Sequence, residues 1–526
     1  MQKYISVPAW AGALAGLTAG GVALGLAQLV AGLFGPQTSP VIAVGDGVVD
    51  LTPAPVKDFA ITTFGENDKT VLVWGVLVLL AVVAAVIGVL ARRRLAYGMA
   101  GLAAFAVVGL VAVVTRPGAS VVDILPTLAG AVAGMWTLAW LLRRATVPAV
   151  SEAPSGEAER PAVMRGSGEP STFDRRRLLT GVAGGVVVAG VGAVAGSRLA
   201  GSRAVDIARV NVALPAPATP AKPIPAGADL RIGGLSSFVT PNRDFYRVDT
   251  ALVVPQVDPE SWKLRIHGMV DRPVEITYTD LLRMPLTEAD VTLTCVSNEV
   301  GGRLVGNARW LGVRMSEILR RAGLHADADM LLSTSADGFT CGTPADVVMD
   351  GREALFAIAM NGEPLPVEHG FPVRQVVPGL YGYVSATKWV VDVKVTRFDR
   401  DEAYWTPRGW AAKGPIKTQS RIDVPGSGAS LKPGRTTIAG VAWAQHKGVA
   451  AVEVRVDGGA WREAKLADVP GPDTWRQWSL DWDATPGSHT LQVRATDTTG
   501  YTQTEQVAPP APDGATGWHT ITVSVA

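Results

Sequence analysis

The chain has 526 residues, of which 48% are hydrophobic and only 18% are charged, and it contains 58 Gly, 36 Pro and 2 Cys. This composition excludes a mainly disordered chain and a small disulfide-stapled fold. A net charge of +1 provides no basic field for nucleic acid. The mean hydropathy of +0.23 is high for a soluble protein and indicates that the apolar residues are unevenly distributed.

The first 200 residues contain five uncharged apolar segments, each about as long as the ~20 residues that cross a bilayer. A buried helix of a globular protein could explain one such segment, but five in series indicate a membrane region. The segments are residues 8–35, 71–91, 95–115, 124–142 and 178–197. We therefore expect four transmembrane helices within 1–144, a cytoplasmic linker at 145–177 and a fifth helix at 178–198.

Basic residues between the segments predict the orientation of these helices. Arginines lie at 92–94, at 143–144 and at 175–177, whereas the stretch 36–69 carries an excess of acidic residues. Because short cytoplasmic loops are enriched in Lys and Arg, these arginines are expected inside. The sequence thus predicts a multi-pass protein of the plasma (inner) membrane, with everything after residue 198 outside the cytoplasm.

The fifth segment begins differently from the others. Asp174-Arg-Arg-Arg-Leu-Leu precedes a weakly hydrophobic Gly/Ala/Val run and resembles an internal twin-arginine export signal. Ordinary positive-inside charge is the alternative interpretation. The run also matches a dinucleotide fingerprint at Gly190, Gly192 and Ala195, but no βαβ pattern surrounds it. We therefore interpret these small residues as a helix-packing surface.

The remaining chain reads as a linker followed by two soluble domains. Residues 199–228 are predicted to be a Pro/Ala-rich linker, with a semi-rigid spacer at 212–227. Residues 229–423 mix short strands and helices, which predicts an α+β domain. Residues 424–526 alternate apolar and polar residues at short spacing, which predicts an all-β immunoglobulin-like sandwich. The expected strands are 262–267, 291–294, 389–395, 451–456, 475–482, 490–495 and 520–525, and the expected helices are 315–322 and 344–357.

The two cysteines allow three interpretations: a disulfide, inert buried thiols, or a metal-ligating thiolate. Cys295 lies where an apolar strand enters a Gly-rich loop, and Cys341 lies in Gly338-Phe-Thr-Cys-Gly342. The six histidines all follow residue 198, so the predicted transmembrane helices cannot hold a haem between two imidazoles. The sequence contains no P-loop motif (G-x-x-x-x-G-K-S/T), no zincin motif (H-E-x-x-H) and no nucleophile-elbow motif (G-x-S-x-G).

Several segments, in order along the chain, resemble the sulfite oxidase family of molybdopterin enzymes. The segment from Met360 to Gly379, followed by Lys388-Trp389, carries the resemblance most strongly. Further segments that match are Thr240–Arg247, Thr294-Cys295-x-x-Asn298, Ala308–Gly312, Gly440–Trp443, Val456–Gly459, Trp475–Trp478 and Gly517–His519. The last four resemble the family's dimerisation domain. The resemblance covers roughly residues 229–526 and leaves the apolar half outside it.

This resemblance implies a molybdenum–molybdopterin cofactor with Cys295 as the protein thiolate on the metal. Cys295 and Arg247 would be the catalytic residues, Arg247 by orienting an oxyanion. The positions that would bind the cofactor are Phe245, Tyr246, Arg247, Val248, Asp249, Asp337, His369, Arg374, Ala386, Thr387 and Lys388. Asp337 is matched only across an alignment gap. Cys341 has no role in the family and is expected to be a buried thiol, which argues against a Cys295–Cys341 disulfide.

The sequence departs from the family at three positions near the implied site. Glu299 and Val300 stand where sulfite oxidases have paired arginines, and Trp410 stands where they have a catalytic tyrosine. A site that has lost a cation and gained a carboxylate is expected to bind a small dianion less well.

The resemblance thus implies a membrane-anchored, outward-facing oxidoreductase that performs two-electron oxygen-atom transfer. Sulfite oxidation is the first candidate reaction, and reduction of an S-oxide or N-oxide is the second. A catalytically inactive, membrane-anchored binding module is a third alternative. Because the sequence shows no haem, flavin or iron–sulfur motif, electrons would pass to a separate cytochrome or quinone-linked protein. A homodimer is implied only by the resemblance of the C-terminal domain.

Overall fold

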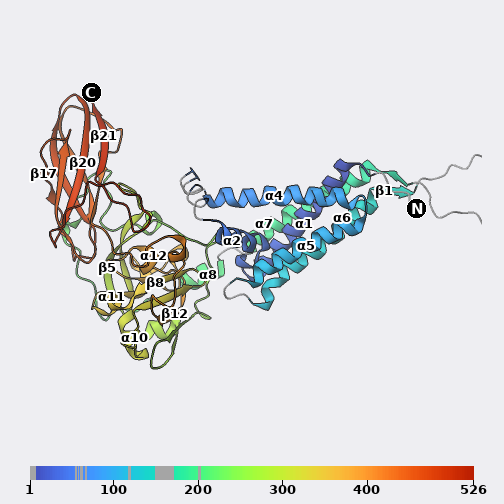
Figure 1. Cartoon of the computed structure of the whole chain (residues 1–526), viewed down its shortest axis with the longest axis horizontal. Helices are drawn as coiled ribbons and strands as arrows, with labels where there is room; N and C mark the ends of the chain where they lie inside the picture. Colours follow the sequence, from blue (N-terminus) through green and yellow to red (C-terminus); the bar gives the residue numbers. More distant parts are fainter. Residues whose placement is uncertain are drawn as a thin grey trace, which may run out of the picture. The chain divides into compact units, whose positions relative to one another are not determined.

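The computed structural model describes residues 7–53, 56, 59, 63–64, 68–116, 120–148, 171–199 and 203–526. It divides into two compact units (Figure 1). The first unit is Met1–Ser202 with Ala251–Val253, and the second is Arg203–Thr250 with Val254–Ala526. Residues 149–170, which make up most of the expected cytoplasmic linker, lie outside the described residues.

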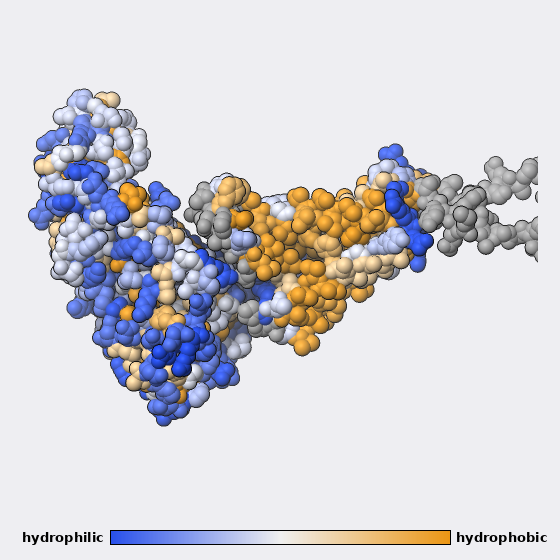
Figure 2. All heavy atoms as spheres, in the orientation of Figure 1, coloured by the Kyte–Doolittle hydropathy of each residue, from blue (hydrophilic) through white to orange (hydrophobic). Residues whose placement is uncertain are grey.

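The first unit is built from long apolar helices, as the sequence predicts. They are α1 Ala9–Phe34, α4 Asp68–Ala91, α5 Leu95–Val114, α6 Leu125–Arg144 and α7 Arg175–Leu199. Within the described part of the chain, these five regions are long and apolar enough to cross a membrane. Figure 2 shows that their visible surface is largely apolar. A shorter helix, α2 Pro40–Leu51, lies within the acidic stretch 36–69, for which the sequence predicts no helix.

Helix α1 packs directly against α4, α6 and α7. Small residues allow this close approach. A Cβ atom on Gly192 of α7 would lie 2.7 Å from the carbonyl oxygen of Gly25 in α1, and one on Gly12 of α1 would lie 2.8 Å from the carbonyl oxygen of Gly88 in α4. Gly192 is therefore part of a helix-packing surface, as predicted, whereas Gly190 has no atom within 4 Å of its Cβ position and lies outside that surface. Strands β1 Thr146–Pro148 and β2 Ser171–Phe173 pair antiparallel in this unit.

The second unit begins with α8 Arg203–Val210, followed by an extended segment. The prediction of a spacer at 212–227 is wrong, because this segment lies against the α+β domain. Thr219 forms a parallel bridge with Thr287, and the carbonyl of Lys222 accepts a hydrogen bond of 3.0 Å from Arg309. The backbone groups of this Pro-rich stretch find partners on the domain, and the segment is held as part of its surface.

The α+β domain contains two five-stranded sheets. One has the order β10-β9-β6-β5 with β11 also paired to β9, and the other has the order β4-β3-β12-β7-β8. The strands of the first sheet are β5 Thr287–Thr294, β6 Val305–Arg314, β9 Leu355–Met360, β10 Glu363–Pro364 and β11 Arg374–Val376. Those of the second are β3 Lys263–Gly268, β4 Val274–Thr277, β7 Met330–Ser335, β8 Thr340–Pro344 and β12 Val390–Thr396. The helices are α9 Tyr278–Arg283, α10 Met315–Ala322, α11 Ala345–Met349 and α12 Gly382–Ser385.

The expected strands at 262–267, 291–294 and 389–395 and the expected helix at 315–322 are confirmed. The expected helix at 344–357 is wrong beyond Met349. Gly351 has a φ of 101°, which ends the helix, and Leu355–Met360 then forms strand β9. All six residues of β9 are buried, and the strand pairs with β6, β10 and β11. A short continuous apolar run suits such an interior strand as well as it suits a helix.

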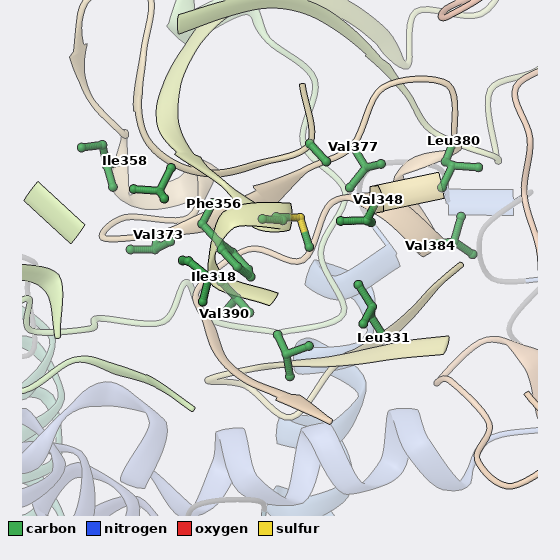
Figure 3. Packing of buried hydrophobic residues seen from close by; sticks show 14 of the residues in the cluster. Ile318, Leu331, Val348, Phe356, Ile358, Val373, Val377, Leu380, Val384 and Val390 are labelled. Carbon is green, nitrogen blue, oxygen red and sulfur yellow. The ribbon is translucent and has the colours of Figure 1, made fainter. Parts of the chain in front are cut away.

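One hydrophobic core joins the two sheets of this domain. Ile318 of α10, Leu331 of β7, Phe356 of β9 and Val390 of β12 belong to it, and each is fully buried (Figure 3). Burying large apolar side chains from both sheets stabilises the fold by roughly 1.5–3 kcal/mol per side chain. The strands that carry the candidate site are therefore anchored in a rigid core.

The C-terminal domain is a sandwich of two sheets, in agreement with the prediction. Their orders are β13-β15-β19-β18 and β14-β21-β20-β16-β17. The strands are β13 Gln419–Val424, β14 Ser430–Leu431, β15 Gly434–Trp443, β16 Val449–Val456, β17 Arg462–Glu463, β18 Lys465–Leu466, β19 Arg476–Ala484, β20 Gly487–Asp497 and β21 His519–Val525. Residues from both sheets, including Ile438, Trp478, Val452 and Leu491, share one core. The first strand begins at Gln419, before the boundary expected at residue 424.

Candidate active site

Cys295 directly follows β5 and opens a tight loop. Its backbone N–H donates to the carbonyl of Leu304 (2.9 Å), while the side-chain oxygen of Asn298 accepts from the Leu304 N–H (2.8 Å). The cysteine is 9% exposed, and its thiol is free. Burial raises the pKa of the Cys295 thiol, although hydrogen bonds from Ser297 act in the opposite direction. A bound cation would therefore be needed to hold this group as a thiolate at neutral pH.

Cys341 lies in β8 and is fully buried, as predicted. Its thiol is also free, so the structure contains no Cys295–Cys341 disulfide. The thiol donates to the carbonyl of Gly382 at 3.9 Å. Burial raises its pKa to about 12, opposed by hydrogen bonds from Thr387 and Ala386. Cys341 is thus a neutral thiol that supports the start of α12.

Arg374, at the start of β11, is a buried cation. Its guanidinium donates to the carbonyls of His369 (3.1 Å) and Ala386 (3.5 Å) and lies 5.0 Å from the ring centroid of Trp310. Its Nε atom is buried and has no hydrogen-bond partner in the described part of the chain. Burial lowers the pKa of Arg374 to about 10, opposed by Tyr246 and Cys341. No carboxylate among the described residues forms an ion pair with it, so the site favours an external anion.

His369 is 2% exposed and lies in the short turn Val367–His369. Burial, together with the charge of Arg374, lowers its pKa to about 4, so the ring is neutral at pH 7. Its Nε2 lies 3.0 Å from the carbonyl oxygen of Asn242 and therefore carries the proton. The ring also meets Phe245 edge to face at 5.6 Å.

Phe245 and Tyr246 form an aromatic wall beside these groups. Their rings stack at 5.3 Å, and Phe245 meets Trp310 edge to face at 5.8 Å. Burial raises the pKa of the Tyr246 phenol far above its ordinary value; Cys295 acts in the same direction and Arg374 in the opposite one. A Cβ atom on Gly382 would lie 3.7 Å from both the Tyr246 hydroxyl and the Thr294 carbonyl oxygen, so the phenol lies near the end of the strand that leads to Cys295.

A second polar group surrounds Asp249, whose side chain is only 6% exposed. Its carboxylate accepts from Lys388 and, at 3.3 Å, from Arg247. Lys388 also donates to the carbonyl of Glu368 (3.2 Å). Arg247 and Val248 are both 48% exposed, so they lie where the site meets solvent.

The remaining predicted residues gather around Cys341. Thr387 is fully buried and bonds to Ser333 through its hydroxyl (2.7 Å), and Ala386 presents its carbonyl to Arg374. Asp337 lies in the turn between β7 and β8, where it accepts from the Phe339 N–H at 3.1 Å and raises the pKa of Cys341. The structure therefore places the Asp337 carboxylate near Cys341.

Two neighbours of the site were not singled out from the sequence. Asn242 supplies the carbonyl that accepts from His369, and Trp310 covers the Arg374 guanidinium. Both lie inside segments that carry the family resemblance.

One of the positions at which the sequence departs from the family is Trp410. Its ring lies 6.0 Å from the Tyr383 ring and 6.1 Å from the Trp405 ring, in an aromatic group beside α12.

Comparison with known proteins agrees with this geometry. Residues 251–405 match the oxidoreductase molybdopterin binding domain, and residues 419–493 match a bacterial Ig domain. The chain is 31% identical to mouse and human mitochondrial sulfite oxidases over 52% of its length, and it spans 58% of theirs. It is 33% identical over 157 residues to the uncharacterized oxidoreductase YuiH of Bacillus subtilis, covering 30% of this chain and 76% of that one.

The chain belongs to the sulfite oxidase family of molybdopterin-dependent oxidoreductases. The sulfane dehydrogenase SoxCD from Paracoccus pantotrophus is also similar, with 26% identity, a TM-score of 0.48, and coverage of 55% of this chain and 85% of that one.

The cofactor of this family is molybdenum–molybdopterin, and the site residues fit it. The cofactor presents an anionic phosphate and a metal that accepts a soft thiolate. Arg374 offers a buried cation whose Nε–H has no acceptor among the described residues, and Cys295 offers a free thiol. A planar guanidinium is suited to bind phosphate through two parallel hydrogen bonds.

Proposed function

We propose that the chain is a sulfite-oxidase-like enzyme that moves an oxygen atom to or from a small substrate in a two-electron reaction. The observation that carries the proposal is the buried Arg374 cation, which forms no ion pair with a carboxylate among the described residues, together with the free thiol of Cys295 at the end of β5. In a chain without an anionic cofactor, a buried cation of this kind would be costly to keep.

In this proposal, each residue has a distinct task. Cys295 holds the metal, Arg374 holds the phosphate, and His369 and Lys388 contact the polar edge of the pterin. Arg247, half exposed beside Asp249, orients the substrate. When bound, the cofactor supplies a metal centre that exchanges an oxygen atom and two electrons with the substrate. The aromatic wall of Phe245 and Tyr246 keeps water from the buried side of the site.

Sulfite oxidation is the first candidate reaction. The pairing of Arg247 with Asp249 and the presence of Glu299 reduce the positive field that would attract a dianion. Reduction of an uncharged S-oxide or N-oxide, which does not depend on such a field, is the second candidate. In both cases the electrons pass to or from a separate cytochrome or quinone-linked protein, and the C-terminal domain joins two copies of the chain.

Metal analysis of the purified full chain tests the proposal. We expect stoichiometric molybdenum, lost in Cys295→Ser and retained in Cys341→Ser, which removes the other buried thiol. A metal-free protein with an intact fold would instead support the binding module. Assays with oxidising dyes and sulfite, and with reducing dyes and S-oxides or N-oxides, then determine the direction of the reaction.

We also propose that the five apolar helices anchor the chain in the plasma membrane and that the second unit faces outward. A folded domain that already holds a cofactor requires an export route for folded proteins, and Arg175–Arg177 precede the last helix as such a signal does. Replacing these three arginines with lysines should leave residues 203–526 inside the cell. The same exchange at Arg143 and Arg144 keeps the charge of another loop and should leave export unchanged. Normal export of the first variant would refute the signal.

A further inference from the structure

The strand that leads to Cys295 has an open edge within its own sheet. β5 lies at the end of the order β10-β9-β6-β5, and on its other edge the isolated bridge from Thr219 reaches only the start of the strand, at Thr287, among the described residues. An edge strand leaves backbone N–H and C=O groups that need other partners when they are buried. Thr292 and Thr294, on the last part of β5, are each 1% exposed.

The C-terminal domain supplies these partners. The Nε2 atom of Gln445 donates to both the carbonyl of Thr292 and the hydroxyl of Thr294, each at 3.0 Å. The Thr292 N–H donates to the carbonyl of Asp473 (2.9 Å), and the Trp475 N–H donates to the Thr292 hydroxyl (2.7 Å). Thr294 is the residue directly before Cys295, so these bonds end one residue from the thiol.

The loop that follows Cys295 is held by the same domain. Arg421 of β13 donates to the carbonyl of Gly302 (2.7 Å) and pairs with Asp423 at 2.6 Å, with both side chains less than 10% exposed. Gly301 has a φ of 79°, and any side chain there would collide with the ring of His519. His519 is itself held, because its Nδ1 accepts from the Ile422 N–H (2.9 Å).

We propose that the C-terminal sandwich serves as a positioning scaffold for Cys295 and that Gln445 is a positioning residue for its thiol. One buried amide ties the strand before Cys295 to the second domain, while Arg421 and His519 fix the loop after it. The consequence for the metal rests on the proposed function, whereas the restraint on the thiol is a property of the chain alone. Residues that orient a metal ligand typically change metal affinity by about 10–100-fold when they are lost.

Gln445→Met tests this role because it keeps the side-chain volume and removes the amide. Gln503→Met is the matched control. Gln503 is equally buried, but its bonds to Gly517, Ser420 and Ala495 stay within the C-terminal domain. If Gln445→Met does not fold, Gln445→Asn withdraws the same amide by one methylene.

The first measurement uses the full chain, purified in detergent without the cofactor. The rate of iodoacetamide labelling is read separately at Cys295 and Cys341 by peptide mass spectrometry. We expect labelling of Cys295 to be about ten-fold faster in Gln445→Met, with Cys341 unchanged, because two buried hydrogen bonds are lost. Gln503→Met should leave both rates unchanged. Equal effects of the two variants, or no effect of Gln445→Met, would overturn the proposal.

The second measurement uses the cofactor-loaded chain. Gln445→Met should shift the sulfur-to-molybdenum absorption band and lower the molybdenum content, whereas Gln503→Met should change neither. An unshifted band with full molybdenum content would overturn the positioning role at the metal. If the chain holds no molybdenum, the proposed enzyme function fails, but the labelling rates still decide whether the second domain restrains Cys295.

Discussion

The Arg374 guanidinium lies 5.0 Å from the ring centroid of Trp310 and is enclosed with it in the α+β domain, where both side chains are buried. Two backbone carbonyls accept hydrogen bonds from Arg374, but they do not neutralise its charge. The cation–π contact offsets only part of the desolvation cost. The arrangement is that of a site built to receive an anion.

Arg374→Met should therefore weaken binding of the cofactor without lowering the stability of the cofactor-free chain. Without the cofactor, we expect the unfolding midpoint of the full chain to stay the same or rise, because an unpaired buried charge is removed. Cofactor retention should fall at least about ten-fold. Arg421→Met provides the contrast, because it leaves Asp423 buried without its partner and should cost about 3–5 kcal/mol. Thermal unfolding and molybdenum content measure both effects; equal destabilisation by the two variants would contradict this interpretation.

The Asp249 carboxylate forms ion pairs with Lys388 and Arg247. These pairs of a buried carboxylate should contribute more to the free energy of unfolding than an ion pair on the surface. Asp249→Asn is expected to lower the free energy of unfolding by about 3 kcal/mol, because it removes a carboxylate charge from a largely buried ion pair with Lys388. The loss should depend little on salt. Glu275→Gln breaks the Lys263–Glu275 pair, in which both side chains are more than half exposed, and should have little effect. Denaturant titration at low and high salt compares the two variants.

Acid should destabilise the second unit through His369 and His519. Burial lowers the pKa of each to about 4, and the charges of Arg374 and Arg421 act in the same direction. The unfolded histidines have pKa values of about 6.5, so the unfolded state takes up protons first as the pH falls. Stability should decline from about pH 6.5 to 4 by roughly 1–3 kcal/mol for each histidine.

His519→Asn tests this pH dependence at a single position. The asparagine oxygen can accept from the Ile422 N–H as Nδ1 does, but it does not titrate. The unfolding midpoint of the variant should change less between pH 6.5 and 4 than that of the parent chain. Identical slopes would show that His519 does not contribute.

The packing of α7 on α1 can be tested with two glycines of one helix. A side chain at Gly192 would collide with the α1 backbone at Gly25, whereas nothing lies within 4 Å of the corresponding position at Gly190. Gly192→Leu should lower the yield of folded chain in detergent and increase proteolysis of the first unit. Gly190→Leu should behave like the parent chain; comparable losses in both variants would contradict the packing.

The sequence alone was sufficient for features that depend on local patterns. The length and apolarity of the five helices are properties of single segments, so their bounds differ from the predicted ones by only a few residues. Alternation likewise located β16, β19, β20 and β21, because one face of each strand packs into the sandwich core. The position of Cys295 at the end of a strand also followed from its neighbours along the chain.

Tertiary structure decided the features that depend on partners distant in sequence. Leu355–Met360 is a strand because β6, β10 and β11 lie beside it, and the spacer at 212–227 is docked because the domain offers hydrogen bonds to it. The unpaired state of Arg374 and the bonds from Gln445 to Thr292 and Thr294 also join residues far apart in the chain. Local patterns report what a segment can bury, but only folding determines which groups meet and whether a buried charge finds a counter-charge.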